Sequence, residues 1–211
     1  MVDRDATAEG LKHGGRVLII GASGGCGLAG CKLSSAMGAS EVVGVCSASN
    51  RALAESQGAT RCVDYNDPAA LSALIAEGSR YDVVYDAATG SGRGEEYSSL
   101  CKEVVAKTGR TIAINGGLKA WLKLFTGWQK ENKKLILTRQ NGAQLEEIVA
   151  LLRAKHEEKK NESKKDKESL GERLVPVVVD STHELSAEGV EAAFSRLKSR
   201  RAKGKIVIDV A

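Results

Sequence analysis

The sequence has few aromatic residues, no long apolar run and no large excess of charge of either sign. Phenylalanine, tryptophan and tyrosine make up 4% of the 211 residues, which argues against the base-stacking surfaces that bind single-stranded nucleic acid. The 31 basic and 27 acidic residues leave a formal net charge of +4, too small to indicate a polyanionic partner. No apolar run approaches the length of a membrane span. We therefore expect neither a nucleic-acid partner nor a membrane partner.

The cysteines show no spacing typical of a metal site or of a disulfide framework. No Cys-x-x-Cys pair occurs, the number of cysteines is odd, and Cys26 and Cys31 have no histidine close by in the sequence. We therefore predict no metal site and expect small, buried, reduced residues. The N-terminus lacks the apolar core of a signal peptide, and its acidic residues are unlike a transit peptide. These features favour a cytoplasmic protein.

Short apolar segments alternate with helix-compatible segments from residue 16 to about residue 138. Hydrophobic residues make up 42% of the sequence, enough for a globular core. The expected strands are residues 17–20, 41–46, 61–65, 82–86, 111–114 and 134–138, and the expected helices are residues 28–37, 51–57, 68–77 and 95–107. Apolar strands separated by helices are typical of a parallel sheet covered on both faces. The sequence therefore predicts the α/β class, as a Rossmann-type, doubly wound parallel sheet of six strands with helices on both faces.

We divide the chain into four segments. Residues 1–15 precede the first strand as an N-terminal remnant, and residues 16–154 form the predicted Rossmann domain. In residues 155–173, 13 of 19 residues are charged with both signs mixed, so we expect a disordered or frayed helical insertion rather than a binding arm. Residues 174–211 contain a predicted strand at 174–179, a helix at 187–198 and a strand at 205–210.

A glycine-rich turn joins the first strand to the first helix. Residues 21–27 read Gly-Ala-Ser-Gly-Gly-Cys-Gly and lie between the apolar residues 17–20 and a helix expected from Leu28. Glycines let backbone N–H groups and a helix N-terminus approach a diphosphate that side chains would block. Placement between a buried strand and a helix favours a dinucleotide site. The alternative interpretation is a purely structural tight turn.

The residues after the second strand favour NADP(H) over NAD(H). NAD sites generally have Asp or Glu at this position for the ribose hydroxyls, whereas residues 46–51 here read Cys-Ser-Ala-Ser-Asn-Arg. No carboxylate in this segment would repel a 2′-phosphate, and Arg51 offers a charge-assisted contact to one. The alternative is that Arg51 is a solvated helix residue.

Several further motifs occur in a familiar order and spacing. They are residues 21–27, 45–47, 58–59, 63–65, 81–86 and 201–208. Together they resemble the medium-chain dehydrogenase/reductase superfamily, and within it the zinc-independent quinone oxidoreductase (zeta-crystallin-like) and enoyl reductase branch. The resemblance covers most of the chain except the charged insertion.

The resemblance implies NADPH as the cofactor, bound by several loops, and a hydride transfer to a quinone, enone or carbonyl. The diphosphate would lie on Gly21, Ser23, Gly24, Gly25, Cys26 and Gly27, where cysteine replaces the valine usual in the family. The 2′-phosphate would lie among Ser47, Asn50, Arg51 and Tyr65, with a further contact from Arg200. The path from adenine to nicotinamide would be lined by Ala87, Ala88, Asn115, Gly116 and Gly117. No catalytic residue is implied.

The family also implies a substrate-binding domain ahead of the cofactor domain, where this sequence has only residues 1–15. We therefore expect the cofactor-binding half alone, which binds NADPH but reduces no quinone or enone until a substrate domain is supplied. The strands at 175–179 and 206–210 are then expected to expose edges prone to association. Relatives pair through the last strand of the cofactor domain, so a homodimer through the segment that contains Ile136 is also expected.

Three alternatives remain to be weighed. A short-chain dehydrogenase needs a Tyr-x-x-x-Lys pair, but Tyr97 and Lys102 are one residue too far apart. A methyltransferase needs an acidic residue where Ser47 stands. A non-catalytic NADPH-binding module remains open.

Trp121 and Trp128 are seven residues apart and are expected to pack on the sheet or against the absent domain.

Overall fold

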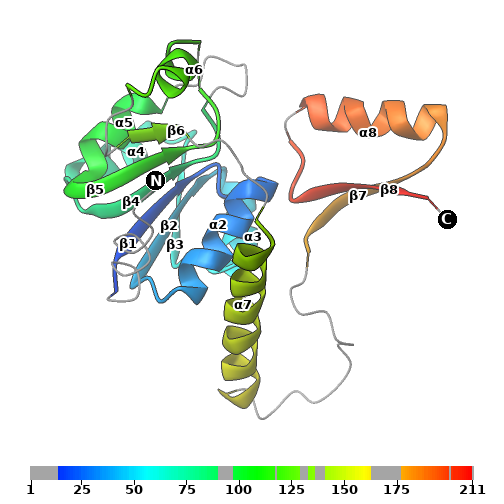
Figure 1. The fold of residues 1–211 in the computed structure, drawn as a ribbon, viewed down its shortest axis with the longest axis horizontal. Helices are drawn as coiled ribbons and strands as arrows, with labels where there is room; N and C mark the ends of the chain where they lie inside the picture. The colour runs from blue at the N-terminus through cyan, green and yellow to red at the C-terminus, as the bar shows by residue number, and fades with distance from the viewer. Residues whose placement is uncertain are drawn as a thin grey trace. The chain divides into compact units, whose positions relative to one another are not determined.

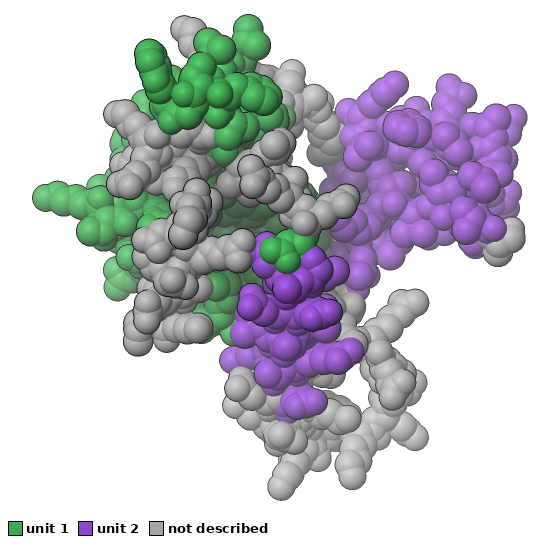
Figure 2. Space-filling view, in the orientation of Figure 1, with its two compact units in different colours: residues 1–141 green, residues 142–211 purple. Residues whose placement is uncertain are grey.

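The computed structural model describes residues 14–89, 97–116, 118–128, 133–135, 141–162, 177–199 and 201–210. The chain forms two compact units, residues 1–141 and residues 142–211, which Figure 2 shows in different colours. The boundary between them, after residue 141, lies ahead of residue 154, where we expected the Rossmann domain to end. Each unit is described by itself.

Unit 1 is built on a six-stranded sheet with the strand order β3-β2-β1-β4-β5-β6 (Figure 1). The strands are β1 Arg16–Ile20, β2 Glu41–Cys46, β3 Arg61–Asp64, β4 Tyr81–Asp86, β5 Val105–Ala113 and β6 Lys133–Leu135. Every neighbouring pair is parallel. The order runs outward from β1 in one direction and from β4 in the other, so the predicted doubly wound parallel sheet of six strands is confirmed.

Helices cover both faces of this sheet, as predicted. They are α2 Gly25–Ala36, α3 Arg51–Ser56, α4 Pro68–Ala76, α5 Ser98–Val104 and α6 Leu118–Phe125, with a short 3-10 helix, η1, at Ala48–Asn50. The start of α4 shows why these boundaries arise. The Asp67 carboxylate accepts the backbone N–H groups of Ala69 and Ala70, and Pro68 occupies the first turn, where its missing N–H costs nothing.

Alternate side chains of the strands enter two separate cores. On one face, Leu18 and Ile20 of β1 pack with Leu74 of α4 and with residues of α5. On the other face, Val17 and Ile19 belong to a cluster with residues of α2 and α3. The four β1 side chains are at most 1% exposed. This burial on both faces explains why β1 reads as a continuous apolar run rather than an alternating one.

Several predicted boundaries in unit 1 were wrong. Helix α2 begins at Gly25 and not at Leu28, so the glycine turn itself supplies the first helical residues. The helix predicted through residue 107 ends at Val104, because Val105 already pairs with Tyr81 in the sheet. Strand β5 therefore includes polar residues that had suggested a helix. At β6 the structure describes residues 133–135 as strand, and residues 136–138 lie outside the described residues.

Unit 2 contains the helix α7, Gly142–Glu162, and a strand–helix–strand motif. The motif consists of β7 Val179–Glu184, α8 Ala187–Ser199 and β8 Lys205–Asp209, with the two strands parallel. Helix α7 extends eight residues into the predicted charged insertion, whose remainder lies outside the described residues. Among the described residues, no helix is both long enough and apolar enough to cross a membrane.

The position of β7 corrects another prediction. We expected the strand at residues 174–179, but it begins at Val179 and continues through polar residues to Glu184. The Asp180 carboxylate accepts two hydrogen bonds from Arg196 of α8 and one from the backbone N–H of Lys203. These bonds hold the start of β7 against α8 through Asp180. Val177 and Val210 lie outside the strands and are exposed.

Candidate functional site

The carboxyl ends of the parallel strands in unit 1 lie along one edge of the sheet, because all neighbours run in the same direction (Figure 1). The chain leaves this edge in opposite directions after β1 and after β4, which are neighbours in the sheet. Doubly wound proteins bind their ligands at such a switch point, beyond the carboxyl ends of the strands. The predicted site residues in the segments 21–27, 47–51, 65, 87–88 and 115–116 all follow strands of this sheet at that edge.

The glycine turn at residues 21–24 is fixed by backbone contacts. The N–H groups of Gly21 and Ala22 both donate to the Val45 carbonyl of β2 at 3.0 Å. Gly21 has φ +79°, a left-handed conformation that favours glycine. A Cβ on Gly27 would lie 2.0 Å from the Gly21 oxygen and 2.7 Å from the Ala22 Cα, so the first turn of α2 rests directly on the backbone of the loop. Gly27 is therefore required for the turn itself.

The N-terminus of α2 has no side chain satisfying its first amides. Its N-cap, Gly24, has an extended backbone, no side-chain cap is present among the described residues, and the first turn has no acidic residue. The first intrahelical bond joins the Leu28 N–H to the Gly24 carbonyl at 2.8 Å, so the N–H groups of residues 25–27 precede the helical ladder. A Cβ on Gly24 would meet only the Gly21 oxygen, at 3.5 Å. This positive helix end is suited to an anion.

Asn50, which follows β2, lies beside the glycine turn. Its side-chain nitrogen donates to the Ser23 hydroxyl at 3.3 Å, so the structure brings together two predicted site residues from different loops. Its side-chain oxygen is buried and has no hydrogen-bond partner. An unsatisfied buried acceptor costs about 1–3 kcal/mol. A ligand donor such as a ribose hydroxyl would remove that cost.

Asp64, at the end of β3, is a site residue that the sequence argument missed. Its carboxylate accepts the Ala48 N–H at 3.1 Å, and it accepts both the backbone and side-chain N–H groups of Asn66 at 2.8 and 2.9 Å. The Asn66 backbone N–H lowers the pKa of Asp64 most strongly; desolvation opposes this, while the Ala48 N–H and the charge of Arg51 also lower the pKa. Asp64 thus holds the loop after β2 and brings a negative charge near Arg51.

The other predicted residues of the 2′-phosphate region surround this loop. The Ser47 and Ser49 hydroxyls lie 3.1 Å apart, and the side chains of Arg51 and Tyr65 are exposed. The exposed Arg51 side chain places a positive charge beside this loop. Arg200, the further phosphate contact implied by the resemblance, lies outside the described residues.

Asp86 organises the loop after β4, next to the switch point. Its side chain is 4% exposed, and one carboxylate oxygen accepts the N–H groups of Ala88 and Thr89 at 3.0 and 2.8 Å. The Ala87 N–H donates to the Ile20 carbonyl at 3.1 Å, which ties this loop to the end of β1. Asp86 therefore acts as a loop cap.

The loop after β5 contributes a smaller part of the edge. The Asn115 side-chain oxygen accepts the Gly116 N–H at 2.8 Å, and both residues are half-buried. Gly117 lies outside the described residues. The structure thus brings the described members of the predicted set to one edge of unit 1.

The cysteines are all free, and the prediction of buried residues holds for Cys31, Cys46 and Cys101. It is wrong for Cys26, which is exposed in the first turn of α2, and Cys62 is half-buried. Burial raises the pKa of the Cys31 thiol to about 12, so this thiol stays protonated. Among the described residues, no three His, Cys, Asp or Glu side chains are grouped so that they would hold a metal ion.

The chain is similar to known proteins both in sequence and in fold. A profile of the family described as "Zinc-binding dehydrogenase" matches residues 57–208, which is most of the chain but leaves out the glycine turn. A quinone-oxidoreductase homolog of spinach (Spinacia oleracea), described as chloroplastic, is 28% identical over 198 residues, covering 92% of this chain and 52% of the relative.

Solved structures with the same fold include two quinone oxidoreductases. The enzyme from Coxiella burnetii aligns with a TM-score of 0.67 and 23% identity, over 98% of this chain and 56% of the other. The enzyme from Thermus thermophilus, solved also as a complex with NADPH, gives a TM-score of 0.60 and 24% identity, over 97% and 61%. The chain thus spans just over half the length of these relatives. It belongs to the zinc-binding dehydrogenase family, within the medium-chain dehydrogenase/reductases, and has the fold of their quinone-oxidoreductase-like cofactor-binding half.

Proposed function

We propose that unit 1 binds NADPH and serves as the cofactor-binding half of an oxidoreductase that reduces a quinone, an enone or another carbonyl compound. The observation that carries this proposal is the bare N-terminus of α2 beside the β1–β4 switch point. Anionic ligands with a diphosphate fit this position, because free N–H groups and the helix dipole act on the same charge.

The residues at this edge fit such a cofactor. The N–H groups of residues 25–27 would hold the diphosphate, and the Asn50 oxygen that lacks a partner would accept a ribose hydroxyl. The loop held by Asp86 would border the nicotinamide half, since it follows β4 on the other side of the switch point. When bound, NADPH supplies the hydride, while the protein supplies binding and orientation.

A preference for NADPH over NADH would depend on the balance between Arg51 and Asp64. The guanidinium attracts a 2′-phosphate and is exposed. The Asp64 carboxylate repels one, but three N–H groups already engage it and stabilise its charge. Ser47 and Tyr65 offer only neutral hydroxyl groups to a 2′-phosphate. Arg51 is therefore the group that would carry a preference for NADPH.

The acceptor class and the assembly are proposed from the relatives. The spinach relative and two of the solved structures are named for quinone oxidoreduction, and the Thermus thermophilus enzyme was solved with NADPH. Another structure with this fold is named as an NAD-dependent alcohol dehydrogenase, so the fold alone does not distinguish between NADPH and NADH as the cofactor. A small-molecule acceptor would need a substrate-binding domain, and pairing of two copies through the edge strand β6 remains a proposal. No step of the proposed chemistry goes through a metal.

The location of the protein is a separate proposal. Free cysteines favour a reducing compartment, and we retain the cytoplasm as the expected one. The spinach relative is described as chloroplastic. Microscopy of the full natural chain with a fluorescent tag at its C-terminus would distinguish the cytoplasm from a plastid.

Calorimetric titration of the chain with NADPH and with NADH tests the proposed nucleotide preference. We expect tighter binding of NADPH, and we expect Arg51→Asp to weaken NADPH binding at least tenfold, about 1.4 kcal/mol, with little effect on NADH. Lys107→Asp, at an exposed position in the first half of β5, makes the same charge change toward the opposite edge of the same sheet and should alter neither affinity. Equal affinity for the two nucleotides, or unchanged NADPH binding by Arg51→Asp, would contradict the assignment.

A further inference from the structure

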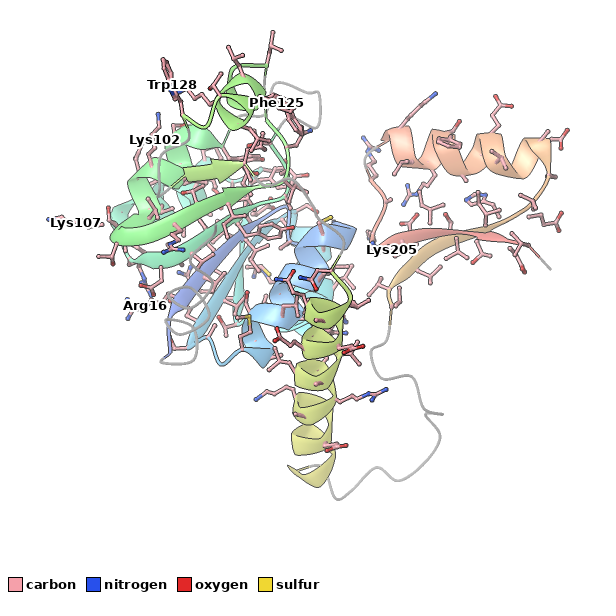
Figure 3. All side chains as sticks on the ribbon, in the orientation of Figure 1. Arg16, Lys102, Lys107, Phe125, Trp128 and Lys205 are labelled. Carbon is pink, nitrogen blue, oxygen red and sulfur yellow. The ribbon has the colours of Figure 1, made fainter. Side chains whose placement is uncertain are left out.

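Helix α6 and the turn after it leave aromatic side chains at the surface. Trp121 and Trp128 were expected to pack on the sheet or against the absent domain. Trp121 is half-buried and stacks on Phe125, with 6.3 Å between the ring centroids. Trp128 is 82% exposed, and Figure 3 shows it at the outer surface of unit 1. Trp128 therefore does not pack on the sheet, and the described residues do not show what covers it.

Two cysteines lie close together next to the loop after β2. Cys46 is the last residue of β2 and is 2% exposed, whereas Cys62 lies in β3 and is half-buried. Gly44 is paired with Cys62 in the sheet, and Cys46 follows two residues later on the same face of β2. Because Gly44 has no side chain, the Cys62 sulfur can lie over β2, where a Cβ on Gly44 would be 3.3 Å from it. The Cys62 side chain is therefore on the side of its strand that faces Cys46.

The two thiols share a hydrogen bond. The Cys62 S–H has two acceptors within reach, the Cys46 sulfur and the Arg51 carbonyl, which is 3.8 Å from the Cys62 sulfur. The hydrogen bond from Cys62 lowers the pKa of the Cys46 thiol, although burial opposes this. The same hydrogen bond, together with burial, raises the pKa of Cys62. Cys46 is thus the thiol that more readily becomes a nucleophilic thiolate, and Cys62 lies in position as its partner.

We propose that Cys46 and Cys62 form a disulfide when the chain reacts with hydrogen peroxide, and that this bond weakens nucleotide binding by shifting the loop after β2. The Cys46 thiolate first takes one peroxide oxygen as a sulfenic acid, the O–O bond breaks, and the released hydroxide takes up the thiol proton as water. The Cys62 sulfur then attacks the Cys46 sulfur, the S–O bond breaks, and the hydroxyl leaves with the Cys62 proton as a second water. Two thiols lose two electrons, and one peroxide is reduced to two waters.

Closure of this bond requires a small movement of the strands. Neighbouring strands lie about 4.8 Å apart and rise about 3.3 Å per residue, so Cα atoms staggered by two positions are about 8 Å apart. Disulfides span Cα separations of about 4.4–6.8 Å. Strand β3 is outermost in the described sheet, so it can shift along β2 without breaking a pairing on its other side. A strained disulfide is also more easily reduced, which makes the change reversible.

Three connections transmit this shift to the loop. Cys46 directly precedes the loop, and Asp64 of β3 accepts the Ala48 N–H at 3.1 Å. The Cys62 S–H that contacts the Arg51 carbonyl is lost in the disulfide. Because Arg51 is the group proposed to bind the 2′-phosphate, oxidation should lower the affinity for NADPH. This last step rests on the proposed function, whereas formation of the disulfide does not.

Peptide mapping tests the disulfide without any nucleotide. Trypsin places Cys46 on residues 33–51, Cys62 on residues 62–80, and Cys26 with Cys31 on residues 17–32. The reduced, folded chain is treated with hydrogen peroxide, and the remaining thiols are blocked before digestion. We expect the peptides 33–51 and 62–80 to be joined with the loss of two hydrogens and to separate after dithiothreitol. Peptides that stay separate, or a link from either one to residues 17–32, would overturn the proposal.

Calorimetric titration with NADPH before and after peroxide tests the effect on binding. We expect oxidation to lower the affinity at least tenfold, and dithiothreitol to restore it. Cys62→Ala should bind NADPH as the reduced natural chain does and keep that affinity after peroxide, because Cys46 then lacks both its partner and the hydrogen bond that lowers its pKa. Cys101→Ala, which removes a buried thiol from the core on the other face of the sheet, should stay as sensitive as the natural chain. Circular dichroism melting checks that both variants are folded.

The outcomes distinguish this proposal from the proposed function. Joined peptides with an unchanged affinity for NADPH would refute the effect on the loop and leave the proposed function intact. If the reduced chain does not bind NADPH, the proposed function fails and the effect on binding fails with it, while the peptide map still decides whether the disulfide forms. An equal loss of affinity after peroxide in Cys62→Ala would assign the effect to another thiol, such as the exposed Cys26, and overturn the proposal.

Discussion

Gly24 and Gly27 lie three residues apart at the start of α2, yet a methyl group has opposite expected effects at the two positions. At Gly27 the new Cβ would lie 2.0 Å from the Gly21 oxygen and 2.7 Å from the Ala22 Cα. Both obstacles are backbone atoms, so α2 must move away from the loop. We expect Gly27→Ala to lower the free energy of unfolding of unit 1 by about 3 kcal/mol, the upper part of the range for overpacking.

At Gly24 the same methyl group should leave the fold intact. The backbone has φ −77° and ψ 163°, which alanine adopts without strain, and the Cβ meets only the Gly21 oxygen at 3.5 Å. Alanine is a poorer N-cap than glycine, but it also reduces the entropy of the unfolded chain by a similar amount. We therefore expect a change of less than about 0.5 kcal/mol in stability. The methyl group would, however, stand where a diphosphate must approach, so NADPH binding should weaken at least tenfold.

Two assays together decide this prediction. Urea unfolding followed by far-ultraviolet circular dichroism gives the stability of each variant, and calorimetric titration with NADPH gives the affinity. The reasoning would be refuted if Gly24→Ala bound NADPH as tightly as the natural chain, because the bare helix end would then not be the site. It would also fail if Gly27→Ala were as stable as the natural chain.

Two further predictions follow from the carboxylates. Asp64→Asn retains an oxygen for the Ala48 N–H but removes a negative charge near Arg51, so NADPH affinity should rise a few-fold relative to NADH; an unchanged ratio in paired titrations would contradict this. In unit 2, the hydrogen bonds and charge of Arg196, helped by the Lys203 N–H and the Ser181 hydroxyl, lower the pKa of Asp180 to about 2. Because the pKa of Asp180 is lower in the folded state than in the unfolded state, the charged carboxylate stabilises the fold at any pH above the unfolded pKa of 3.8. Roughly 1 kcal/mol of stability should therefore be present above pH 4 and disappear as the pH falls toward 2. Hydrogen exchange of the β7 and β8 amides measures it, and Arg196→Ala should remove this pH dependence; an identical dependence in the variant would refute the cause.

The apolar pattern predicted most of the sheet because buried parallel strands must be apolar on both faces. Residues 17–20 and 42–46 are continuous apolar or small runs, and both lie in strands and are buried. Strand β5 was predicted too short, since its first half contains Lys107 and Thr108, which are exposed. Strand β7 was misplaced for a similar reason, because its polar residues form the strand while the apolar Val177 does not.

The candidate site was predicted where local sequence determines it and missed where strand order does. The glycine turn is a contiguous motif, so its position between β1 and α2 could be predicted directly. The role of Asp64 could not, because it depends on β3 lying beside β2 with Cys46 paired to Asp64. The contact between Asn50 and Ser23 likewise joins residues that are 27 positions apart. Neither contact leaves a spacing in the sequence that a motif search would find.

Amide NMR of the isotope-labelled chain during titration with NADPH tests the central claim most directly. The account predicts that the largest and saturable chemical shift changes occur at the N–H groups of residues 24–27, with smaller changes after β2 and β4. Saturable changes confined to unit 2, or no changes at residues 24–27, would contradict the claim that this helix end binds a dinucleotide.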